Sequence, residues 1–360
     1  MTTVAVALSG GVDSSFAAWK LVKAGFNCRA VFMRTHPCEG EFLTCGEQVC
    51  AESARRVAEQ LKIPFQILDV TREFRPAVED YFVSEYLAGR TPNPCPRCNR
   101  LIKFGLMAEK MFADGADFFA TGHYVRIARE GPDFRLLRGA DHGKDQSYFL
   151  FNLRREVLSR LRFPIGEMTK DAVRRAVRAA GLPTHSRPES QEVCFVPNDD
   201  HLAYLRHRAP EAFRPGPIVD MSGKHIGEHP GIAGFTVGQR RGLRVAVGVP
   251  IYVARIDAKT NTLVAGYRED LLARHLTAEN VNWLIDTPTS PIHAEVQIRY
   301  RHRAAPARII PQADHCARVE FDEPVWAVTP GQAAVFYHDD HLLGGGWIAS
   351  PSTVSEISDH

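Results

Sequence analysis

No part of the sequence is a long apolar run. A membrane-spanning helix needs about 20 consecutive apolar residues, and no such stretch occurs in the 360 residues, so we expect no contact with a membrane interior. Cysteine is scarce, at 8 residues, which is too few for a scaffold held by disulfides. Neither sign of charge prevails, because the chain has 44 Lys and Arg and 42 Asp and Glu. This balance excludes a histone-like polycation, but it does not exclude a basic surface on one side of the protein.

We also expect no secretion signal, because Met1-Thr2-Thr3 leads straight into a strand-like apolar run. We therefore expect a cytoplasmic protein with reduced cysteines. In that compartment a close cysteine pair indicates metal or redox chemistry more than a structural bridge. The hydrophobic fraction of 44% and the charged fraction of 24% are typical of globular chains and exclude general disorder.

The first half of the sequence alternates between short apolar runs and helical patterns. Strands are predicted at 4–8, 30–33, 65–68 and 118–121, with amphipathic helices between them. The first helix ends at Gly25, and a later one begins near Arg100. This alternation predicts an α/β fold with a doubly wound parallel sheet.

The last third of the sequence reads as β structure. Strands at 252–256 and 262–265 flank a turn, and further strands are predicted at 317–321 and 333–337, which indicates a small barrel. Pro and Gly at 213–217 suggest a boundary. We expect a catalytic domain at 1–200, a small central domain at 201–275 and a C-terminal β-barrel at 276–352. The polar tail after Ile348 is expected to fray.

A glycine-rich loop, Ser9-Gly10-Gly11-Val12-Asp13-Ser14-Ser15, joins the first strand to the first helix. Its glycines let backbone amides turn inward as an anion nest, and the following helix N-terminus favours negative charge. A helix cap in a tight turn is the structural alternative. The string is neither a Walker A loop nor a dinucleotide fingerprint. It resembles the PP-loop of ATP pyrophosphatases, which transfer AMP to a substrate oxygen and release pyrophosphate.

The resemblance implies that ATP and Mg²⁺ bind here, with Asp13 positioning the metal. Met33 and Gly122, at the ends of the second and fourth strands, resemble adenine-contacting positions, although Met33 alone would be assigned to the core. The predicted nucleotide-binding residues are Ala7, Leu8, Ser9, Gly10, Gly11, Val12, Asp13, Ser14, Met33 and Gly122.

Two cysteines stand in a proline-bearing segment, Thr91–Asn99, which we expect to be a loop before a helix. Near that helix N-terminus, with Arg97 and Lys103 close in sequence, the pKa of Cys98 would be lowered. Inert burial is expected for Cys28, Cys50 and Cys316, whereas Cys38 and Cys45 fall in a loop that could be exposed.

Seven motifs occur in the order typical of bacterial tRNA-specific 2-thiouridylases, and the match runs from about Val4 to the glycines at 344–346, nearly the whole chain. The motifs are the PP-loop, Asn93-Pro94 with Cys98-Asn99, Thr121–Tyr124, Lys144–Tyr148, Phe163–Gly166, Ser190-Gln191 with Cys194-Phe195, and Thr236–Leu243. The chain therefore resembles that family. The resemblance implies that ATP adenylates O2 of the wobble uridine in the anticodon loop and that sulfur then replaces this oxygen.

The resemblance also implies the catalytic pair. Cys194 matches the persulfide-bearing cysteine, and Cys98 matches the cysteine that attacks the persulfide and forms a disulfide with Cys194. A cellular reductant then resets the pair. A sulfur-donor protein or sulfide is the implied partner, and we expect a monomer acting on one tRNA.

Cys95 departs from the family pattern, which commonly has Asp three residues before the first catalytic cysteine. A Cys transfers protons poorly at neutral pH, so that role is in doubt here. Cys95, Cys98 and Cys194 could instead hold a 4Fe–4S cluster with one open iron. Persulfide chemistry with Cys95 as a bystander and adventitious zinc are the alternatives.

Contacts with tRNA are expected in three segments. Asn93, Pro94 and Cys95 match the target-base segment, and Lys144, Asp145 and Gln146 match a tRNA-contact segment. In the β region, Arg299 and Tyr300 open a basic, acid-free run through Arg303 that suits a nucleic-acid groove, although an isolated basic strand is more often a solvated edge. The arginine-rich stretch 154–187 is either a solvated face or a second phosphate track.

Two other classes of protein remain open. One is a different PP-loop enzyme, either another tRNA thiolase or an amidotransferase-type synthetase. The other is a non-catalytic RNA-binding protein with a structural metal, although such a protein needs no phosphate nest. Release of pyrophosphate that depends on unmodified tRNA would separate these classes.

Overall fold

The computed structural model describes residues 1–36, 45–185, 193–245 and 248–349. The predictions for Cys38, Ser190, Gln191 and the tail from 350 lie outside the described residues, as does the side chain of Cys45. The chain divides into two compact units. Unit 1 comprises residues 1–79, 95–199 and 340–342, and unit 2 comprises the rest. This division cuts across chain order, so the three predicted domain borders stay predictions.

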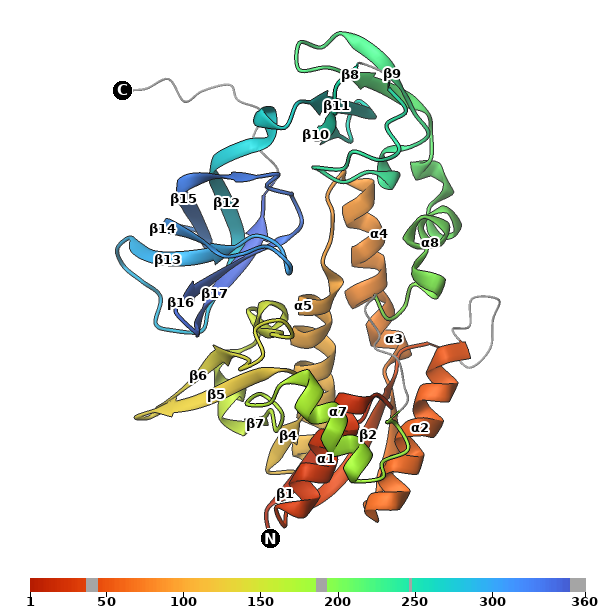
Figure 1. The fold of residues 1–360 in the computed structure, drawn as a ribbon, viewed down its shortest axis with the longest axis vertical. Coiled ribbons are helices and arrows are strands. Elements are labelled where there is room, and N and C mark those ends of the chain that lie inside the picture. The colour runs from red at the N-terminus through yellow and green to blue at the C-terminus, as the bar shows by residue number, and fades with distance from the viewer. Residues whose placement is uncertain (37–44, 186–192, 246–247, 350–360) are drawn as a thin grey trace. The chain divides into compact units, whose positions relative to one another are not determined.

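Unit 1 is built on a five-stranded sheet in the order β3-β2-β1-β4-β7 (Figure 1). All of its pairings are parallel. The strands are β1 (Thr3–Ala7), β2 (Asn27–Arg34), β3 (Phe65–Asp69), β4 (Phe118–Ala120) and β7 (Leu161–Arg162). The order steps outward from β1 in both directions, which confirms the predicted doubly wound sheet.

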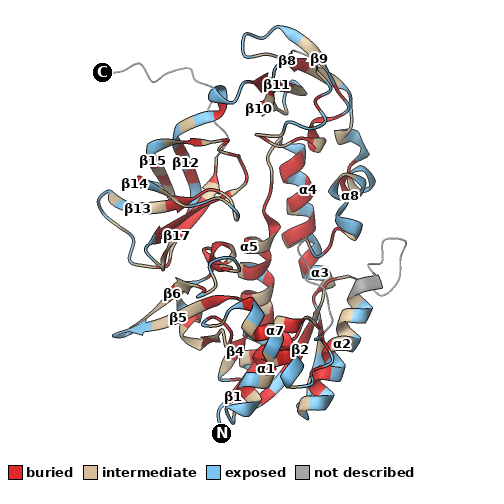
Figure 2. Cartoon of the chain, viewed as in Figure 1, coloured by how far each residue is buried: buried red, intermediate tan, exposed pale blue. Residues whose placement is uncertain are grey.

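Helices cover both faces of this sheet. α1 (Val12–Lys23) and α2 (Cys45–Leu61) bury Leu21 and Val57 against Val6 of β1. On β4, Phe119 faces the other way and meets Phe104, with ring centroids 6.0 Å apart. Alternation along β4 therefore serves two cores at once. Figure 2 shows these inner strands as buried and the outer helix faces as exposed.

The remaining helices of unit 1 are α3 (Thr71–Phe74), a π-helical segment Arg75–Glu79, α5 (Pro94–Cys98), a π-helical segment Asn99–Met107, α6 (Ala108–Ala113) and α7 (Lys170–Ala179). A hairpin of β5 (Val125–Glu130) and β6 (Asp133–Arg138) follows the sheet's fourth strand. Short 3₁₀ turns lie at Ser147–Leu150, Arg155–Arg160 and Pro197–Asp199.

Unit 2 contains α4 (Asp80–Leu87), α8 (His201–Arg208) and two β structures. A four-stranded sheet in the order β10-β11-β8-β9 is formed by β8 (Gly216–Val219), β9 (His225–His229), β10 (Tyr252–Asp257) and β11 (Thr262–Gly266). The predicted hairpin of β10 and β11 is confirmed, with the turn at the positive-φ Asn261. 3₁₀ turns lie at Pro210–Ala212, Ile232–Gly234 and Glu269–Leu271.

The C-terminal strands close into a barrel, as predicted. Its order is β12-β15-β14-β13-β16-β17, and β12 pairs again with β17 to complete the ring. The strands are β12 (Leu272–Trp283), β13 (Ile292–Gln297), β14 (Ala305–Gln312), β15 (Cys316–Trp326), β16 (Ala333–His338) and β17 (His341–Ile348). Alternate residues such as Val296, Ile309, Val319 and Phe336 fill its interior.

Candidate active site

The glycine-rich loop forms the predicted turn between β1 and α1. Gly10 has φ of 75°, a conformation that a side chain would strain, and Gly11 is the N-cap of α1. No side chain caps this helix. The loop is held from within, because the Ser14 hydroxyl accepts from the Ser9 amide at 3.2 Å and the Ser15 hydroxyl donates to Gly11 O at 2.7 Å. The turn therefore offers backbone amides and a helix N-terminus to an anion.

Gly122, at the end of β4, passes directly over this loop. A Cβ at Gly122 would lie 2.6 Å from the Ser14 amide nitrogen, so only glycine permits the approach. Met33 is half-buried at the end of β2. The carboxyl ends of β1, β2 and β4 thus bring the predicted nucleotide-binding residues to one edge of the sheet, where α/β folds bind their ligands.

Asp13 has partners that the sequence did not indicate. The Lys170 ammonium lies 2.8 and 2.7 Å from its two oxygens, and the Tyr124 hydroxyl donates to one of them at 2.7 Å. Mg²⁺ takes carboxylate oxygens in near-octahedral geometry, but both oxygens of Asp13 are already engaged. The residues around the PP-loop therefore fit ATP phosphates, and they offer Mg²⁺ no ready ligand at Asp13.

The segment predicted as a loop around the cysteines is non-helical at 91–93, as expected, but helical from Pro94 onward. α5 begins at Pro94 and continues through the π-helical segment into α6. The loop prediction was wrong for this part because prolines at the first helical positions lose no hydrogen bond, since those amides have no partner within the helix. Cys95 and Cys98 are therefore helical. A π-helical turn follows Cys98 directly, a feature often found at functional sites.

Three of the cysteines in unit 1, Cys95, Cys98 and Cys194, interact with one another. Electrostatic interactions couple Cys95 to Cys194, Cys194 to Cys98 and Cys98 to Cys95, and Lys103 is the cation that acts on all three. Their exposure differs: Cys98 is buried, Cys95 is half-buried and Cys194 is exposed. An exposed thiol next to a buried one is the arrangement expected of an acceptor of sulfur and its resolving partner.

The expected lowering of the Cys98 pKa is wrong. Burial raises the pKa of this thiol to about 11, and the Lys103 ammonium opposes the shift only in part. Arg97 gives no help, because its Nε donates to Ala77 O at 2.6 Å. Desolvation by surrounding protein atoms also raises the pKa of the Cys194 thiol, and the Cys98 thiol adds to this shift. Cys194 is nevertheless an exposed residue.

Two residues near the cysteines, Lys103 and His123, have neighbours that the sequence did not indicate. Lys103 donates to the Asn99 carboxamide oxygen at 3.1 Å, and the buried Asn99 donates to Phe149 O at 3.0 Å. Lys103 is thereby fixed one helical turn after the cysteines. Burial, together with the Lys103 charge, holds the pKa of His123 well below its ordinary value, so His123 is neutral beside this cation. The spacing 99–103 on a helix was the available signal.

Metal ligation finds no support in the described geometry. Among the described residues, no group of three or more His, Cys, Asp or Glu side chains is arranged to hold a metal ion. All three cysteines belong to that part of the chain. The arrangement of Cys95, Cys98 and Cys194 in the described residues therefore does not fit a cluster.

The predicted tRNA-contact segments differ in their surroundings. Asn93 and Pro94 are buried. Asp145 is buried as well, and its carboxylate accepts from the amides of Gly139 and Ser147 at 2.8 and 3.0 Å. Gln146 accepts from the Tyr124 amide at 3.0 Å. Asp145 and Gln146 hold their own loop in shape, while Lys144 is half-exposed on it.

The basic run at Arg299 is a loop between β13 and β14, not a strand as expected. The Arg299 guanidinium donates to Trp326 O at 2.7 Å and Ala327 O at 2.9 Å, and it lies 5.6 Å from the Trp326 ring centroid. Tyr300 is half-buried, and its carbonyl accepts from Gln297 at 2.8 Å. Arg301 and Arg303 are the exposed cations of this loop.

Much of the arginine-rich stretch serves the fold. Arg160 and Arg162 each lie 3.6 Å from the centroid of a phenylalanine ring, Phe112 and Phe118. Arg154 pairs with Glu109, and Arg155 lies 2.8 Å from Asp133. These partners favour the structural interpretation of this stretch over a phosphate track for the described arginines.

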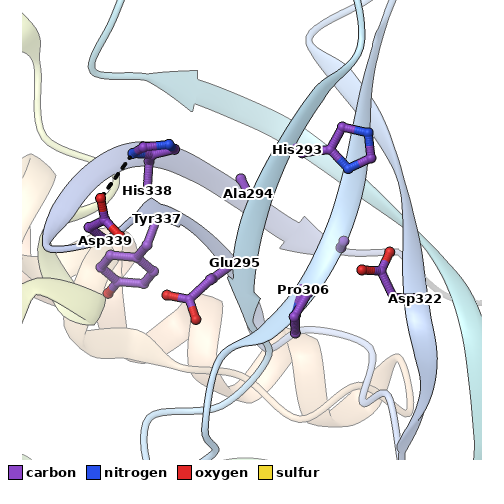
Figure 3. Close-up of a pocket in the computed structure, with 9 residues that line it drawn as sticks. His293, Ala294, Glu295, Pro306, Asp322, Tyr337, His338 and Asp339 are labelled. Carbon is purple, nitrogen blue, oxygen red and sulfur yellow. Dashed lines mark ion pairs between the residues drawn. The ribbon is translucent and has the colours of Figure 1, made fainter.

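A pocket of about 240 Å³ lies on the barrel of unit 2 (Figure 3). Glu295, Asp322 and Asp339 line it together with His293 and His338, and His338 pairs with Asp339 at 3.5 Å. Its carboxylates would repel phosphates, so it is unsuited to the tRNA backbone.

No helix in the described ranges has the length and apolarity that crossing a membrane requires.

Fold and site together define an ATP-using enzyme of the PP-loop class. Family models match three consecutive parts of the chain: the tRNA methyl transferase HUP domain at residues 2–198, the tRNA methyl transferase PRC-barrel domain at 203–267 and the aminomethyltransferase β-barrel domain at 273–348.

The curated relatives are more specific. The tRNA-specific 2-thiouridylase MnmA of Geobacter metallireducens is 46% identical over 358 residues, covering 97% of each chain. The protein of that name from Chloroflexus aggregans is 46% identical over 356 residues, covering 98% of this chain and 99% of its own. The chain belongs to the tRNA-specific 2-thiouridylase family, and it is a tRNA 2-thiouridylase by this homology.

Proposed function

We propose that the chain replaces O2 of the wobble uridine in tRNA by sulfur in two steps, using Cys98 and Cys194 as the catalytic pair. The observation that carries this proposal is the coupling of an exposed Cys194 to a buried Cys98 within the unit that also holds the PP-loop. Both half-reactions thereby have their residues in one compact unit.

In the first step, O2 of the uridine bonds to the α-phosphorus of ATP, pyrophosphate leaves with the bonding electron pair, and the N3 proton passes to solvent. The amides around Gly10 and Gly11 and the N-terminus of α1 bind the phosphates. Mg²⁺, when bound, would neutralise phosphate charge and would take its ligands mainly from the phosphates and water, as is usual for this ion. Adenylation turns a poor leaving oxygen into AMP.

In the second step, a donor protein that carries a cysteine persulfide transfers its outer sulfur to the Cys194 thiolate; the S–S bond of the donor breaks, the donor keeps its thiol, and Cys194 becomes the persulfide. The Cys98 thiolate attacks the Cys194 sulfur, which forms the disulfide and releases hydrosulfide. The hydrosulfide bonds to C2 of the uridine, and AMP leaves with the C–O electron pair. A dithiol reductant returns two electrons and two protons to the disulfide. The exposure of Cys194 supports access for the donor, and the burial of Cys98 supports protection of the released sulfide from solvent.

Recognition of tRNA is assigned to Asn93, Pro94 and Cys95 for the target base, and to the loop of Lys144 with its framework residues Asp145 and Gln146. Arg299 and Tyr300 support a basic loop on the barrel. The proposed site suits a flipped base better than a duplex, since a uridine must leave its stack to reach buried thiols. A monomer suffices, because unit 1 holds every proposed catalytic residue.

The test is pyrophosphate release with unmodified tRNA, measured beside formation of 2-thiouridine. We expect release only with tRNA, and thiolation only when a sulfur donor is added. Release without tRNA would instead favour a small-molecule synthetase, and no release with any tRNA would contradict the proposal.

A further inference from the structure

A buried cation stands beside the PP-loop, and the proposed mechanism does not yet use it. The Lys170 side chain is only 9% exposed, and its ammonium contacts both Asp13 oxygens at 2.7 and 2.8 Å. Asp13 lies in the first turn of α1, immediately after the glycines. Lys170 is the first residue of α7, about 157 positions further along the chain.

Lys170 is held from several sides. Its amide donates to Asp141 at 2.9 Å, and Thr169 caps α7 by accepting from the Ala172 amide. The ammonium lies 5.7 Å from the ring centroid of Tyr124, whose hydroxyl donates to Asp13 at 2.7 Å. Lys170 is thus preorganised next to a loop that lacks a lysine of its own.

A lysine buried against a carboxylate is expected to cost folding free energy unless the pair serves a ligand. The Lys170 ammonium gives up most of its hydration, whereas the Asp13 side chain keeps 31% exposure, and apolar residues of the same volume as a buried ion pair often stabilise a fold as well. The pair borders a helix N-terminus shaped for anions, so an arriving phosphate would replace or share the carboxylate as the partner of the ammonium. For the ammonium to exchange the carboxylate for a phosphate, only the flexible Lys170 side chain has to rotate.

We propose that Lys170 binds the β- and γ-phosphates of ATP and neutralises the departing pyrophosphate, and that Asp13 with Tyr124 positions it. The ligand class is a pyrophosphate or triphosphate chain. This inference rests on the proposed adenylation, in which the bond from the α-phosphorus to the bridging oxygen breaks and pyrophosphate takes the electron pair. Lys170 contributes charge and no proton, so the balance of that step is unchanged. Asp13 is a positioning residue and not a metal ligand.

The experiment measures binding of inorganic pyrophosphate to the full chain by calorimetry, without tRNA. Lys170→Met should weaken binding roughly 10- to 100-fold, the value of a charge-assisted hydrogen bond, and Lys170→Arg should restore most of it. The matched control is Lys20→Met, since Lys20 is an exposed lysine of α1 that donates to Pro164 O at 2.7 Å. Equal affinity of Lys170→Met and Lys20→Met would overturn the proposal, as would wild-type protein that binds no pyrophosphate.

Asp13→Asn separates positioning from metal binding. We expect a lower kcat for AMP formation and an unchanged Mg²⁺ concentration at half-maximal rate. A large rise in that Mg²⁺ concentration would make Asp13 a metal ligand and overturn its positioning role. The binding arm is independent of turnover: if wild-type protein binds pyrophosphate through Lys170 but forms no AMP with any tRNA, the proposed function fails while the binding assignment stands. Melting temperatures identify any variant that is unfolded. If Lys170→Met is unfolded, the pyrophosphate affinity of Lys170→Arg is compared with that of Lys20→Met instead.

Discussion

Phe195, the residue after Cys194, packs edge-on against Phe74, with ring centroids 5.9 Å apart and an interplanar angle of 75°. Both rings are buried, at 2% and 0% exposure. On its other side Phe74 meets His36, again at 5.9 Å. The exposed thiol of Cys194 is therefore carried by a backbone that one buried aromatic side chain anchors.

Loss of this anchor should affect sulfur transfer and leave adenylation intact. For Phe195→Ala we expect thiolation to slow roughly tenfold, because a displaced reacting group loses its alignment. Release of pyrophosphate with tRNA should stay near wild type, since the PP-loop is untouched. Phe112→Ala, at a half-buried phenylalanine that contacts Arg160, is the control. A parallel fall of both activities in Phe195→Ala would contradict the anchoring role.

The two cysteines should fail at different stages. Cys98→Ser should still accept sulfur on Cys194, seen by intact-protein mass spectrometry as one added sulfur atom, and should then stall. Cys194→Ser should accept none. Both variants should release pyrophosphate with tRNA. Cys316→Ser, at a half-buried cysteine of the barrel, is the control. Sulfur retained in Cys194→Ser would show that another thiol is the acceptor.

Metal analysis after anaerobic purification decides between persulfide and cluster chemistry. From the described geometry we expect little iron and no acid-labile sulfide per chain, and Cys95→Ser should keep most of the thiolation activity. About four irons with matching sulfide, lost in Cys95→Ser, would instead make Cys95, Cys98 and Cys194 cluster ligands. Zinc without sulfide that leaves activity unchanged on removal would be adventitious.

Local pattern predicted β1, β2 and β4 because their apolar runs are largely buried in the parallel sheet, and it predicted β3 although only Leu68 of that strand is buried. The error within Thr91–Asn99 arose from reading proline as a breaker, whereas Pro94 begins α5. The Cys98 pKa was misjudged for a related reason: sequence shows the nearby Lys103 but not the burial that outweighs it. The exposed Cys194 and the buried Cys98 looked alike in sequence.

The pairing of Asp13 with Lys170 could not be predicted, since tertiary structure alone brings α7 to α1. Gly122 illustrates a different limit. The sequence singled out Gly122 because it resembles an adenine-contacting position. The requirement for glycine has a different cause: a Cβ at this position would lie 2.6 Å from the Ser14 backbone nitrogen. Contacts between segments that are distant in sequence therefore determine these features, and periodicity and motif spacing do not show such contacts.

His36 should make stability depend on pH. Burial alone would lower its pKa, but hydrogen bonds and charges from Glu47 and Glu79 outweigh this and raise the pKa to about 9. His36 Nε2 lies 3.1 Å from Glu79. The stabilisation is complete below the ordinary histidine pKa near 6.5 and is lost as pH rises through about 9.

Urea unfolding of the full chain at pH 6 and pH 9.5 measures this effect. Wild type should lose on the order of 2 kcal/mol over that interval. His36→Asn should be less stable at pH 6 and should lose much less on the way to pH 9.5. His142→Asn, at an exposed histidine, is the control and should behave as wild type. An identical pH slope in His36→Asn would refute the assignment.

The basic loop of the barrel should divide into a structural and a binding part. Arg301 and Arg303 are exposed, whereas the Arg299 guanidinium is bound to the carbonyls of Trp326 and Ala327. Arg301→Ala with Arg303→Ala should weaken tRNA binding and lower the slope of log affinity against log salt by about 1 for each phosphate that the protein no longer neutralises. The melting temperature should not change.

Arg299→Ala should have the opposite signature, because it removes a donor from the Trp326 carbonyl and leaves the Ala327 carbonyl with the Thr329 hydroxyl. We expect a lower melting temperature of the full chain and a nearly unchanged salt slope at temperatures where the variant is folded. Arg274→Ala, at an exposed arginine on β12, controls for general loss of charge. If Arg299→Ala alone lowered the salt slope while melting as wild type, Arg299 would be the residue that binds phosphate and the exposed pair would be dispensable.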